Sequence, residues 1–462
     1  MTRRLSTRTM VLIWADIVII LGGFYLGLLL RLGTDGAAEQ IFENFGWLKV
    51  FLMAAICLVN LYLYDLYDFA VINSRRELVL RLVQALGITW VLLAVLFYFF
   101  PFLLVGRGAA VYSVVIILIS MLGLRIAIHY LMGHPELGEK ILIVGNGSVV
   151  TEAASAVSSR RDAGYRIVGF MTDERLDKPG TNGSLRNFGV TAALEDVVQN
   201  EKIDRIVIGV RERRGAFPAE PLLRLRLAGN VNIEESSSFF ERVTGRVHLD
   251  NLLPSWLIFS FRPRDTRIKT LVREGLHRGL ALIGLIVSFP IAILVALLVR
   301  FTSRGPIFYK QERVGKNGKV FRVIKFRSMR ADAESDDRPV WASTEDDRTT
   351  LVGGFLRKTR LDEIPQFWNI LKGEMSFVGP RPERPFFVAK LAEEIPFYEY
   401  RHLVAPGLTG WAQIKFPYGS SVEDAKQKLQ YDLYYIKNQN LTLDIVIVFE
   451  TVKTVLFGRG GR

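Results

Sequence analysis

The sequence is poor in cysteine, with Cys57 as the only one in 462 residues. A single cysteine excludes a disulfide within the chain and a cysteine-based zinc site. Cys57 lies inside an apolar run, so we expect it to be a small buried hydrophobic residue. The basic N-terminus leads into a long apolar stretch, and no small-residue cleavage site follows that stretch. We therefore predict a retained membrane helix rather than a cleaved signal peptide.

Hydrophobic residues make up 50% of the chain and are clustered, which is typical of membrane segments. Four apolar runs precede residue 135, each close to the ~20 residues that a bilayer-spanning helix needs. They cover residues 10–30, 47–66, 85–105 and 109–130. Basic residues gather before the first run, between the second and third, and after the fourth. This bias predicts four transmembrane helices in residues 1–135 with both ends in the cytoplasm. Asp16, near the start of the first run, is expected to reach the interface.

Residues 136–250 have the pattern of a Rossmann-like module. Strand-like runs at 140–145, 165–171, 205–210 and 231–234 alternate with helix-like stretches, which predicts a doubly wound parallel sheet. Gly145 and Gly147 flank Asn146 in the turn after the first strand, where such folds hold a phosphate. The third glycine of the fingerprint is replaced by Val150, and Asp173 is the candidate ribose-binding acid. Nucleotide binding and a purely structural turn both remain open.

A connector at 251–272 leads to a further hydrophobic stretch that is broken near its middle. Pro290 removes a backbone hydrogen bond and bends a helix, and Ser288 could bond to a freed carbonyl. Both flanks of the stretch are basic, so neither flank favours crossing the membrane. We therefore expect a re-entrant helix that returns to the cytoplasmic face. The alternative is an ordinary kinked span, which would place the C-terminal region outside the cell.

Residues 310–330 contain eight basic residues, with Glu312 as the only acid. This one-sided charge favours a phosphate-bearing partner, although attraction to anionic lipid would explain the outermost residues. Farther on, Asp362 and Glu363 are adjacent, and two such carboxylates repel each other unless a charge offsets them. Mg²⁺, which prefers oxygen ligands together with substrate phosphates, is the predicted metal. Three nearby arginines could hold phosphate oxygens, with Pro380 and Pro382 limiting the backbone around the second. They are Arg360, Arg381 and Arg384.

Together with the broken helix, the motifs KFRSM, LDEIPQ, SFVGPRP and PGLTGWAQI resemble the bacterial sugar transferase family of monotopic phosphoglycosyl transferases. That resemblance covers about residues 270–462, and the preceding half is similar to the long members, the undecaprenyl-phosphate glucose or galactose phosphotransferases. It implies a membrane α plus α/β chain: a four-helix transmembrane bundle (1–135), a Rossmann-like accessory module (136–250), the connector (251–272), and a catalytic domain with the re-entrant helix (273–462).

The resemblance also implies a reaction, in which a UDP-sugar and undecaprenyl phosphate give polyprenyl-diphosphate-sugar and UMP. Asp362 would be the nucleophile that carries a covalent phosphosugar, and Glu363 would support Mg²⁺. Phosphate would be bound by Lys325, Arg327, Arg360, Arg381 and Arg384. The implied setting is the cytoplasmic face of a bacterial inner membrane, at the first membrane step of exopolysaccharide, capsule or O-antigen synthesis. Membrane lipid is an expected partner and nucleic acid is not, while the sugar and a homodimer remain open.

Two other functions compete with this one. A nucleotide-sugar dehydratase or epimerase needs a Tyr-x-x-x-Lys pair, but Tyr165 is the only tyrosine between residues 150 and 260, and position 169 is glycine. A non-catalytic scaffold for polysaccharide export would not explain paired acids among arginines. We expect His402 to be structural rather than a base, because carboxylates already serve the mechanism. Residues 441–457 are expected to form an interfacial amphipathic helix.

Overall fold

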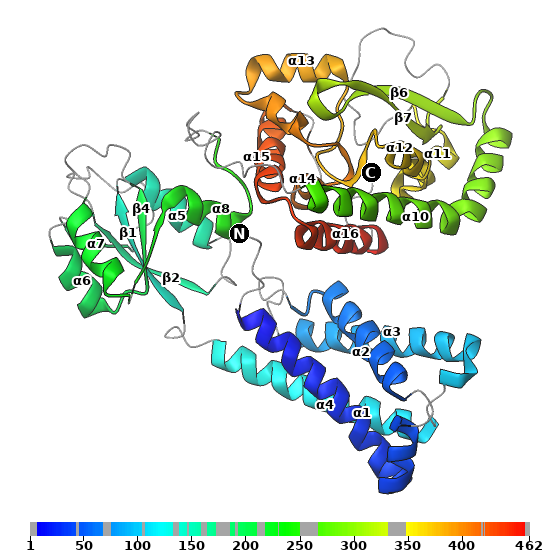
Figure 1. Ribbon diagram of the computed structural model, residues 1–462, viewed down its shortest axis with the longest axis horizontal. Coiled ribbons are helices and arrows are strands. Elements are labelled where there is room, and N and C mark those ends of the chain that lie inside the picture. Colours follow the sequence, from blue (N-terminus) through cyan, green and yellow to red (C-terminus); the bar gives the residue numbers. More distant parts are fainter. Residues whose placement is uncertain are drawn as a thin grey trace. The chain divides into compact units, whose positions relative to one another are not determined.

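The computed structural model divides the chain into two compact units, Arg3–Thr244 and Gly245–Arg462. Each unit is described by itself (Figure 1). The structure describes residues 7–42, 46–67, 75–103, 107–132, 138–145, 147–158, 164–171, 185–189, 193–209, 218–229, 231–249, 267–330, 348–416, 419 and 421–457. Asn146, Asp173 and most of the predicted connector lie outside these residues.

The first unit begins with four long helices that share one core of buried apolar side chains. They are α1 (Thr7–Phe42), α2 (Gly46–Leu63), α3 (Arg75–Phe99) and α4 (Arg107–Met132), with the short η1 (Pro101–Leu103) before α4. Close packing of α1 on α4 depends on two glycines of α1. A Cβ at Gly23 would lie 2.6 Å from Ile117, and one at Gly27 would lie 2.1 Å from Ser113. Small residues spaced four apart let two helix backbones approach each other closely.

The expectation that Asp16 reaches the interface is wrong. Asp16 is completely buried, and its carboxylate lies 2.6 Å from the guanidinium of Arg125 on α4. The Arg125 guanidinium also lies over the ring of Tyr67, 5.2 Å from its centroid. Arg125 lies 109 residues farther along the chain, on another helix. Each charge is buried next to the opposite one, which offsets part of the cost of removing both from water. The pair therefore links α1 to α4 inside the core.

The second half of the unit is a five-stranded parallel sheet of order β3-β2-β1-β4-β5, which confirms the predicted parallel-sheet module. In β1, Ile141 and Ile143 face one core, whereas Leu142 and Val144 face the other. This alternation arises because successive side chains of a strand point to opposite faces. Figure 1 shows α5 and α8 on one face and α6 and α7 on the other. The elements are β1 (Glu139–Gly145), α5 (Gly147–Ser158), β2 (Tyr165–Met171), β3 (Arg186–Asn187), α6 (Leu194–Glu201), β4 (Arg205–Gly209), α7 (Ala219–Leu227), β5 (Asn232–Glu235) and α8 (Ser236–Thr244).

In the second unit, short strands and helices pack along one side of a long helix, α10 (Figure 1). Val247 and Leu249, which the predicted module 136–250 includes, pack in the core of this unit. Strands β6 and β7 form an antiparallel hairpin, and β8 and β9 form a parallel pair. The elements are α10 (Arg267–Thr302), β6 (Phe308–Val314), η5 (Lys316–Gly318), β7 (Val320–Phe326), α11 (Leu351–Thr359), η6 (Leu361–Glu363), α12 (Gln366–Lys372), β8 (Ser376–Val378), α13 (Pro385–Glu394), η7 (Tyr398–Leu403), β9 (Gly407–Thr409), α14 (Trp411–Lys415), α15 (Val422–Asn438) and α16 (Leu441–Leu456).

Helix α10 contains Pro290, and Figure 1 shows the helix turning sharply in its second half. The Ser288 hydroxyl donates a hydrogen bond of 2.6 Å to the carbonyl of Gly284, one turn earlier. A proline has no N–H for the helix ladder, which is the physical cause of bends of this kind. Many apolar side chains of α10 are exposed, including Val287 and Phe289. An apolar helix with an exposed surface of this kind is suited to lipid contact.

Among the described residues, five helices are long and apolar enough to cross a membrane, by length and composition. They lie at Met10–Phe42, Gly46–Leu63, Glu77–Phe99, Gly108–Ala127 and Ile268–Thr302. Helix α3 begins well before the predicted apolar run at 85–105. Its first turns are charged, and Glu77 forms an ion pair of 2.7 Å with Arg81. Hydropathy alone detects the apolar part of such a helix and not its polar start.

Candidate functional site

The acidic pair lies in a single turn between two helices of the second unit. Helix α11 ends because Arg360 adopts a left-handed conformation, with φ of 61°. Asp362 and Glu363 follow in the 3-10 turn η6, and Pro365 precedes the first residue of α12. Both acids are buried, at 6% and 8% exposure. The local sequence thus places two adjacent carboxylates where water has little access.

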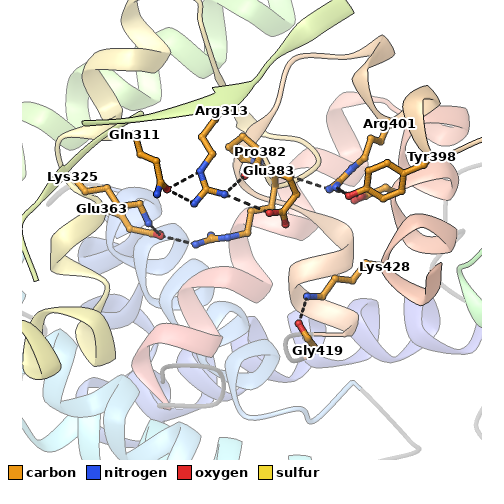
Figure 2. A network of polar contacts seen from close by, with 12 residues as sticks. Gln311, Arg313, Lys325, Glu363, Pro382, Glu383, Tyr398, Arg401, Gly419 and Lys428 are labelled. Atoms are coloured by element: carbon orange, nitrogen blue, oxygen red, sulfur yellow. Dashed lines mark hydrogen bonds and ion pairs between the residues drawn. The ribbon is translucent and has the colours of Figure 1, made fainter. Parts of the chain in front are cut away.

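Glu363 is surrounded by three cations. Its Oε1 accepts hydrogen bonds from Lys325 Nζ at 2.9 Å and Arg381 Nη2 at 3.1 Å, and its Oε2 lies 3.7 Å from Arg360 Nη1. Figure 2 shows Lys325 and Glu363 joined in this way. Burial by itself would raise the pKa of Glu363, but Lys325, Arg381 and Arg360 together hold that pKa well below its usual range. Glu363 is therefore ionised and fixed in place.

Asp362 differs from its neighbour in its contacts. Within the described ranges, its buried carboxylate makes no hydrogen bond or salt bridge. Burial raises the pKa of Asp362, and the charge of Lys325 is the strongest effect in the opposite direction. A buried carboxylate without a bonding partner among the described residues, next to a cationic cluster, is suited to attack an anionic phosphate. The two acids thus differ in their surroundings.

The predicted phosphate-binding residues fall into two groups. Lys325, Arg360 and Arg381 converge on Glu363. Arg327 is buried, and its Nη2 donates to the carbonyl and the hydroxyl of Ser303, both at 2.7 Å, just after α10. Arg384 immediately precedes α13 as its N-cap residue. Phosphate binding by all five residues stays a prediction.

Sequence reasoning missed two arginines that bind the main chain of the turn carrying Arg381. Arg313 Nη1 donates to the carbonyl of Pro382 at 2.9 Å, and Arg401 Nη2 donates to the carbonyl of Arg381 at 3.0 Å (Figure 2). The sequence held a weak signal for Arg401, which lies in an aromatic stretch, FYEYRHL. An isolated arginine in such a setting needs a buried partner.

His402, next to Arg401, has a depressed pKa. Burial and then the charge of Arg401 lower the pKa of His402 to about 4, so the ring is neutral near pH 7. A base with so low a pKa accepts protons poorly under those conditions. This property favours the structural role that was expected for His402.

Two carboxylates are compatible with Mg²⁺. The described part of the chain contains no group of three or more His, Cys, Asp or Glu residues that could hold a metal ion by themselves. Mg²⁺ usually binds one or two carboxylates, and substrate phosphates and water complete its coordination. Asp362 and Glu363 fit that pattern, so they are the residues that would hold the ion.

Gly145 and Gly147 lie at the end of β1 and the start of α5. Gly145 ends β1 with φ of 158°, and a Cβ there would lie 3.0 Å from the backbone of Gly209. Gly147 begins α5, so the turn leads directly into a helix N-terminus. The close approach of β1 and β4 therefore explains why position 145 is glycine without any ligand. A nucleotide at Gly145 and Gly147 remains a prediction.

Comparisons with known proteins find two matching family models and several relatives. A family model described as bacterial sugar transferase matches residues 268–458, and one described as CoA-binding domain matches residues 62–211. The UDP-N-acetylgalactosamine-undecaprenyl-phosphate N-acetylgalactosaminephosphotransferase of Aeromonas hydrophila is 39% identical over 261 residues, which are 56% of this chain and 61% of that protein. The undecaprenyl-phosphate glucose phosphotransferase of Komagataeibacter xylinus is 33% identical over 340 residues, 70% of this chain and 60% of that protein.

A shorter relative is matched over most of its length. The exopolysaccharide production protein PSS of Rhizobium leguminosarum bv. phaseoli is 41% identical over 181 residues, which are 38% of this chain and 90% of that protein. By contrast, the matched part of this chain spans about three fifths of the two longer relatives, at 61% and 60% of their lengths.

Proposed function

Because the chain belongs to the bacterial sugar transferase family, we propose that it transfers a sugar 1-phosphate from a UDP-sugar to undecaprenyl phosphate. The products would be undecaprenyl-diphosphate-sugar and UMP, at the first membrane step of exopolysaccharide, capsule or O-antigen synthesis. The observation that carries the proposal is the contrast within the acidic pair. Glu363 is bonded to two cations, whereas the buried carboxylate of the neighbouring Asp362 has no hydrogen bond or salt bridge to any of the residues that the structure describes.

The reaction follows from this contrast in two displacements. A carboxylate oxygen of Asp362 bonds to the phosphorus next to the sugar, and the bond from that phosphorus to the bridging oxygen breaks. UMP leaves with the electron pair. A phosphate oxygen of undecaprenyl phosphate then attacks the same phosphorus and releases the Asp362 carboxylate. Splitting the transfer in this way replaces one difficult step by two easier ones.

The remaining charged residues provide electrostatic stabilisation. Lys325, Arg360 and Arg381 face the site with about a quarter to two fifths of their side chains exposed, at 24%, 37% and 38%. They can therefore contact Glu363 and still offer N–H groups to the diphosphate. Fixed donors of this kind stabilise charge that develops during the displacement. Mg²⁺ held by Asp362 and Glu363 would neutralise further charge on the diphosphate.

We also propose how the chain lies in the membrane. Helices α1–α4 would form a transmembrane bundle in a bacterial inner membrane, and α10 would enter the bilayer, bend at Pro290 and return to the cytoplasmic face. The basic flanks of α10 and its exposed apolar surface support this topology. A reporter fused after residue 462 should be cytoplasmic, and an external reporter would exclude re-entry.

The activity is tested with the purified full chain, Mg²⁺, undecaprenyl phosphate and a panel of UDP-sugars, by following UMP release. The panel includes UDP-glucose, UDP-galactose and UDP-N-acetylgalactosamine. Asp362→Asn should abolish release, whereas Asp196→Asn, an exposed substitution on α6, should leave it unchanged. Without the lipid acceptor, mass spectrometry should find the phosphosugar on the peptide that contains Asp362. Folded protein that releases no UMP from any sugar would refute the proposal.

A further inference from the structure

The turn that carries Arg381 is held by donors from several elements. Its sequence contains two prolines, Pro380 and Pro382, which have no N–H and leave the turn few hydrogen bonds of its own. Four successive carbonyls are instead bonded from outside. The pairs are Pro380 O with Gly407 N at 2.9 Å, Arg381 O with Arg401 Nη2 at 3.0 Å, Pro382 O with Arg313 Nη1 at 2.9 Å, and Glu383 O with Val314 N at 2.9 Å.

Arg401 is the most deeply buried side chain among these donors. It is 6% exposed, and its Nη2 also lies 2.9 Å from Oδ2 of Asp432, which is 2% exposed. Its Nη1 donates to the hydroxyl of Tyr398 at 2.6 Å (Figure 2). A guanidinium that leaves water is stable only when its charge is paired and its donors are used. Asp432 pairs the charge, and Tyr398 and the Arg381 carbonyl use Nη1 and Nη2, while Nε has no hydrogen-bond partner among the described residues. These contacts orient the guanidinium.

This buried group is linked to the reacting centre by a single residue. The main-chain carbonyl of Arg381 accepts from Arg401, while the side chain of the same residue donates to Glu363 at 3.1 Å. The direction of a side chain depends on the orientation of its own backbone. A small rotation of this peptide would therefore move the Arg381 guanidinium away from the phosphate position, and displacements of about 1 Å can cost two orders of magnitude in rate.

We propose that Arg401 is a positioning residue that acts through the backbone of Arg381, and that Asp432 and Tyr398 orient Arg401 for this task. The inference rests on the proposed function, because it assigns Arg381 to the phosphate of the sugar donor. Arg401 itself does not touch substrate. Its charge is paired with that of Asp432, and it affects the reaction only through its hydrogen bond to the main-chain carbonyl of Arg381.

The test compares Arg401→Lys and Tyr398→Phe in the full chain. Lysine keeps the charge opposite Asp432 but cannot donate to the Arg381 carbonyl and Tyr398 with the geometry of a guanidinium. We expect kcat/KM for the UDP-sugar to fall about tenfold in Arg401→Lys, and less in Tyr398→Phe, the milder change that keeps the guanidinium. A matched control is Arg205→Lys in the first unit, where Arg205 lies between Glu139 and Glu234 at 2.7 and 3.0 Å.

A double substitution separates positioning from general loss of structure. If Arg401 acts through Arg381, Arg401→Lys should lower kcat/KM by less than about twofold in an Arg381→Lys background, since coupled residues are not additive. An equal loss in both backgrounds would show that Arg401 has a merely structural role and would overturn the proposal. Tyr398→Phe in the same two backgrounds gives the same comparison if Arg401→Lys does not fold.

Amide hydrogen exchange over residues 379–384 tests the link without using activity. Exchange in this segment should be faster in Arg401→Lys and Tyr398→Phe, and unchanged in Arg205→Lys. Unchanged exchange in both site variants would refute the link between Arg401 and the turn. If the parent chain releases no UMP, the proposed function fails, and the exchange measurement alone still decides whether Arg401 holds the turn.

Discussion

Replacing Glu363 by glutamine should loosen the cationic cluster without changing its size. Glu363 is 8% exposed, and its Oε1 accepts from both Lys325 at 2.9 Å and Arg381 at 3.1 Å. Removing one partner of a buried ion pair costs about 3–5 kcal/mol when the other charge stays buried. Here the cations are 24% and 38% exposed and can regain water, and the amide oxygen can still accept one hydrogen bond. We therefore expect a loss of roughly 2 kcal/mol in the free energy of unfolding.

The assay has a thermal and a kinetic part. A loss of that size lowers Tm by roughly 4–8 °C in a domain of about 200 residues. Turnover should fall at least about 100-fold, since Lys325 and Arg381 no longer share a fixed anion. The matched control is Glu312→Gln on the hairpin, where Glu312 pairs with Arg322 at 3.4 Å and both side chains are largely exposed, at 59% and 70%. Surface pairs contribute about 0–1 kcal/mol, so the control should change little.

One result would refute this reasoning directly. If Glu363→Gln and Glu312→Gln had the same Tm and the same UMP release, Glu363 would not organise the cations. A loss of turnover with unchanged Tm would refute only part of the reasoning. It would assign Glu363 to the reaction or to Mg²⁺ and remove its stabilising role.

Three further predictions use other parts of the chain. Asp16→Asn should lower the free energy of unfolding in detergent by about 3 kcal/mol, because Arg125 stays buried without its carboxylate partner. The double variant Asp16→Leu with Arg125→Met, which removes both charges, should be more stable than Asp16→Asn in thermal unfolding. The pKa of His402 is lowered to about 4 in the folded chain, so stability should fall as the pH drops from 7 towards 4, when the unfolded chain binds the extra proton. His402→Asn should flatten that dependence in chemical unfolding, and an unchanged slope would exclude His402 as its source. EDTA should stop UMP release and added Mg²⁺ should restore it, while release that persists in EDTA would exclude the ion.

Much of the local structure was predictable because it depends on neighbouring residues. The alternation in Ile141–Val144 is the period of a strand buried on both faces, and the lengths of the apolar runs match membrane helices. The adjacency of Asp362 and Glu363 is also visible in the sequence. So is the pair of prolines around Arg381, which marks a turn of restricted backbone.

The pairing of charges was decided by the tertiary structure alone, because the partners are far apart along the chain. Asp16 was expected at the interface, yet Arg125 meets it 109 residues later inside the helix core. Lys325 and Arg327 lie two residues apart in the KFRSM motif. Lys325 reaches Glu363, whereas Arg327 binds Ser303. The motif alone could not predict these different partners, because the path of the folded chain determines which anion or carbonyl each cation contacts.

The sequence by itself determined which segments are apolar, which alternate, and where two carboxylates are adjacent, since these properties need only near neighbours. The family resemblance assigned different roles to the two acids, but only the folded chain shows how their surroundings differ. Cations from β7 and from the turn after β8 meet Glu363, whereas Asp362 has no hydrogen bond or salt bridge within the described part of the chain. The same folding placed Arg401 behind Arg381. The physical reason is that charges act over a few ångströms in space, whatever their separation in sequence.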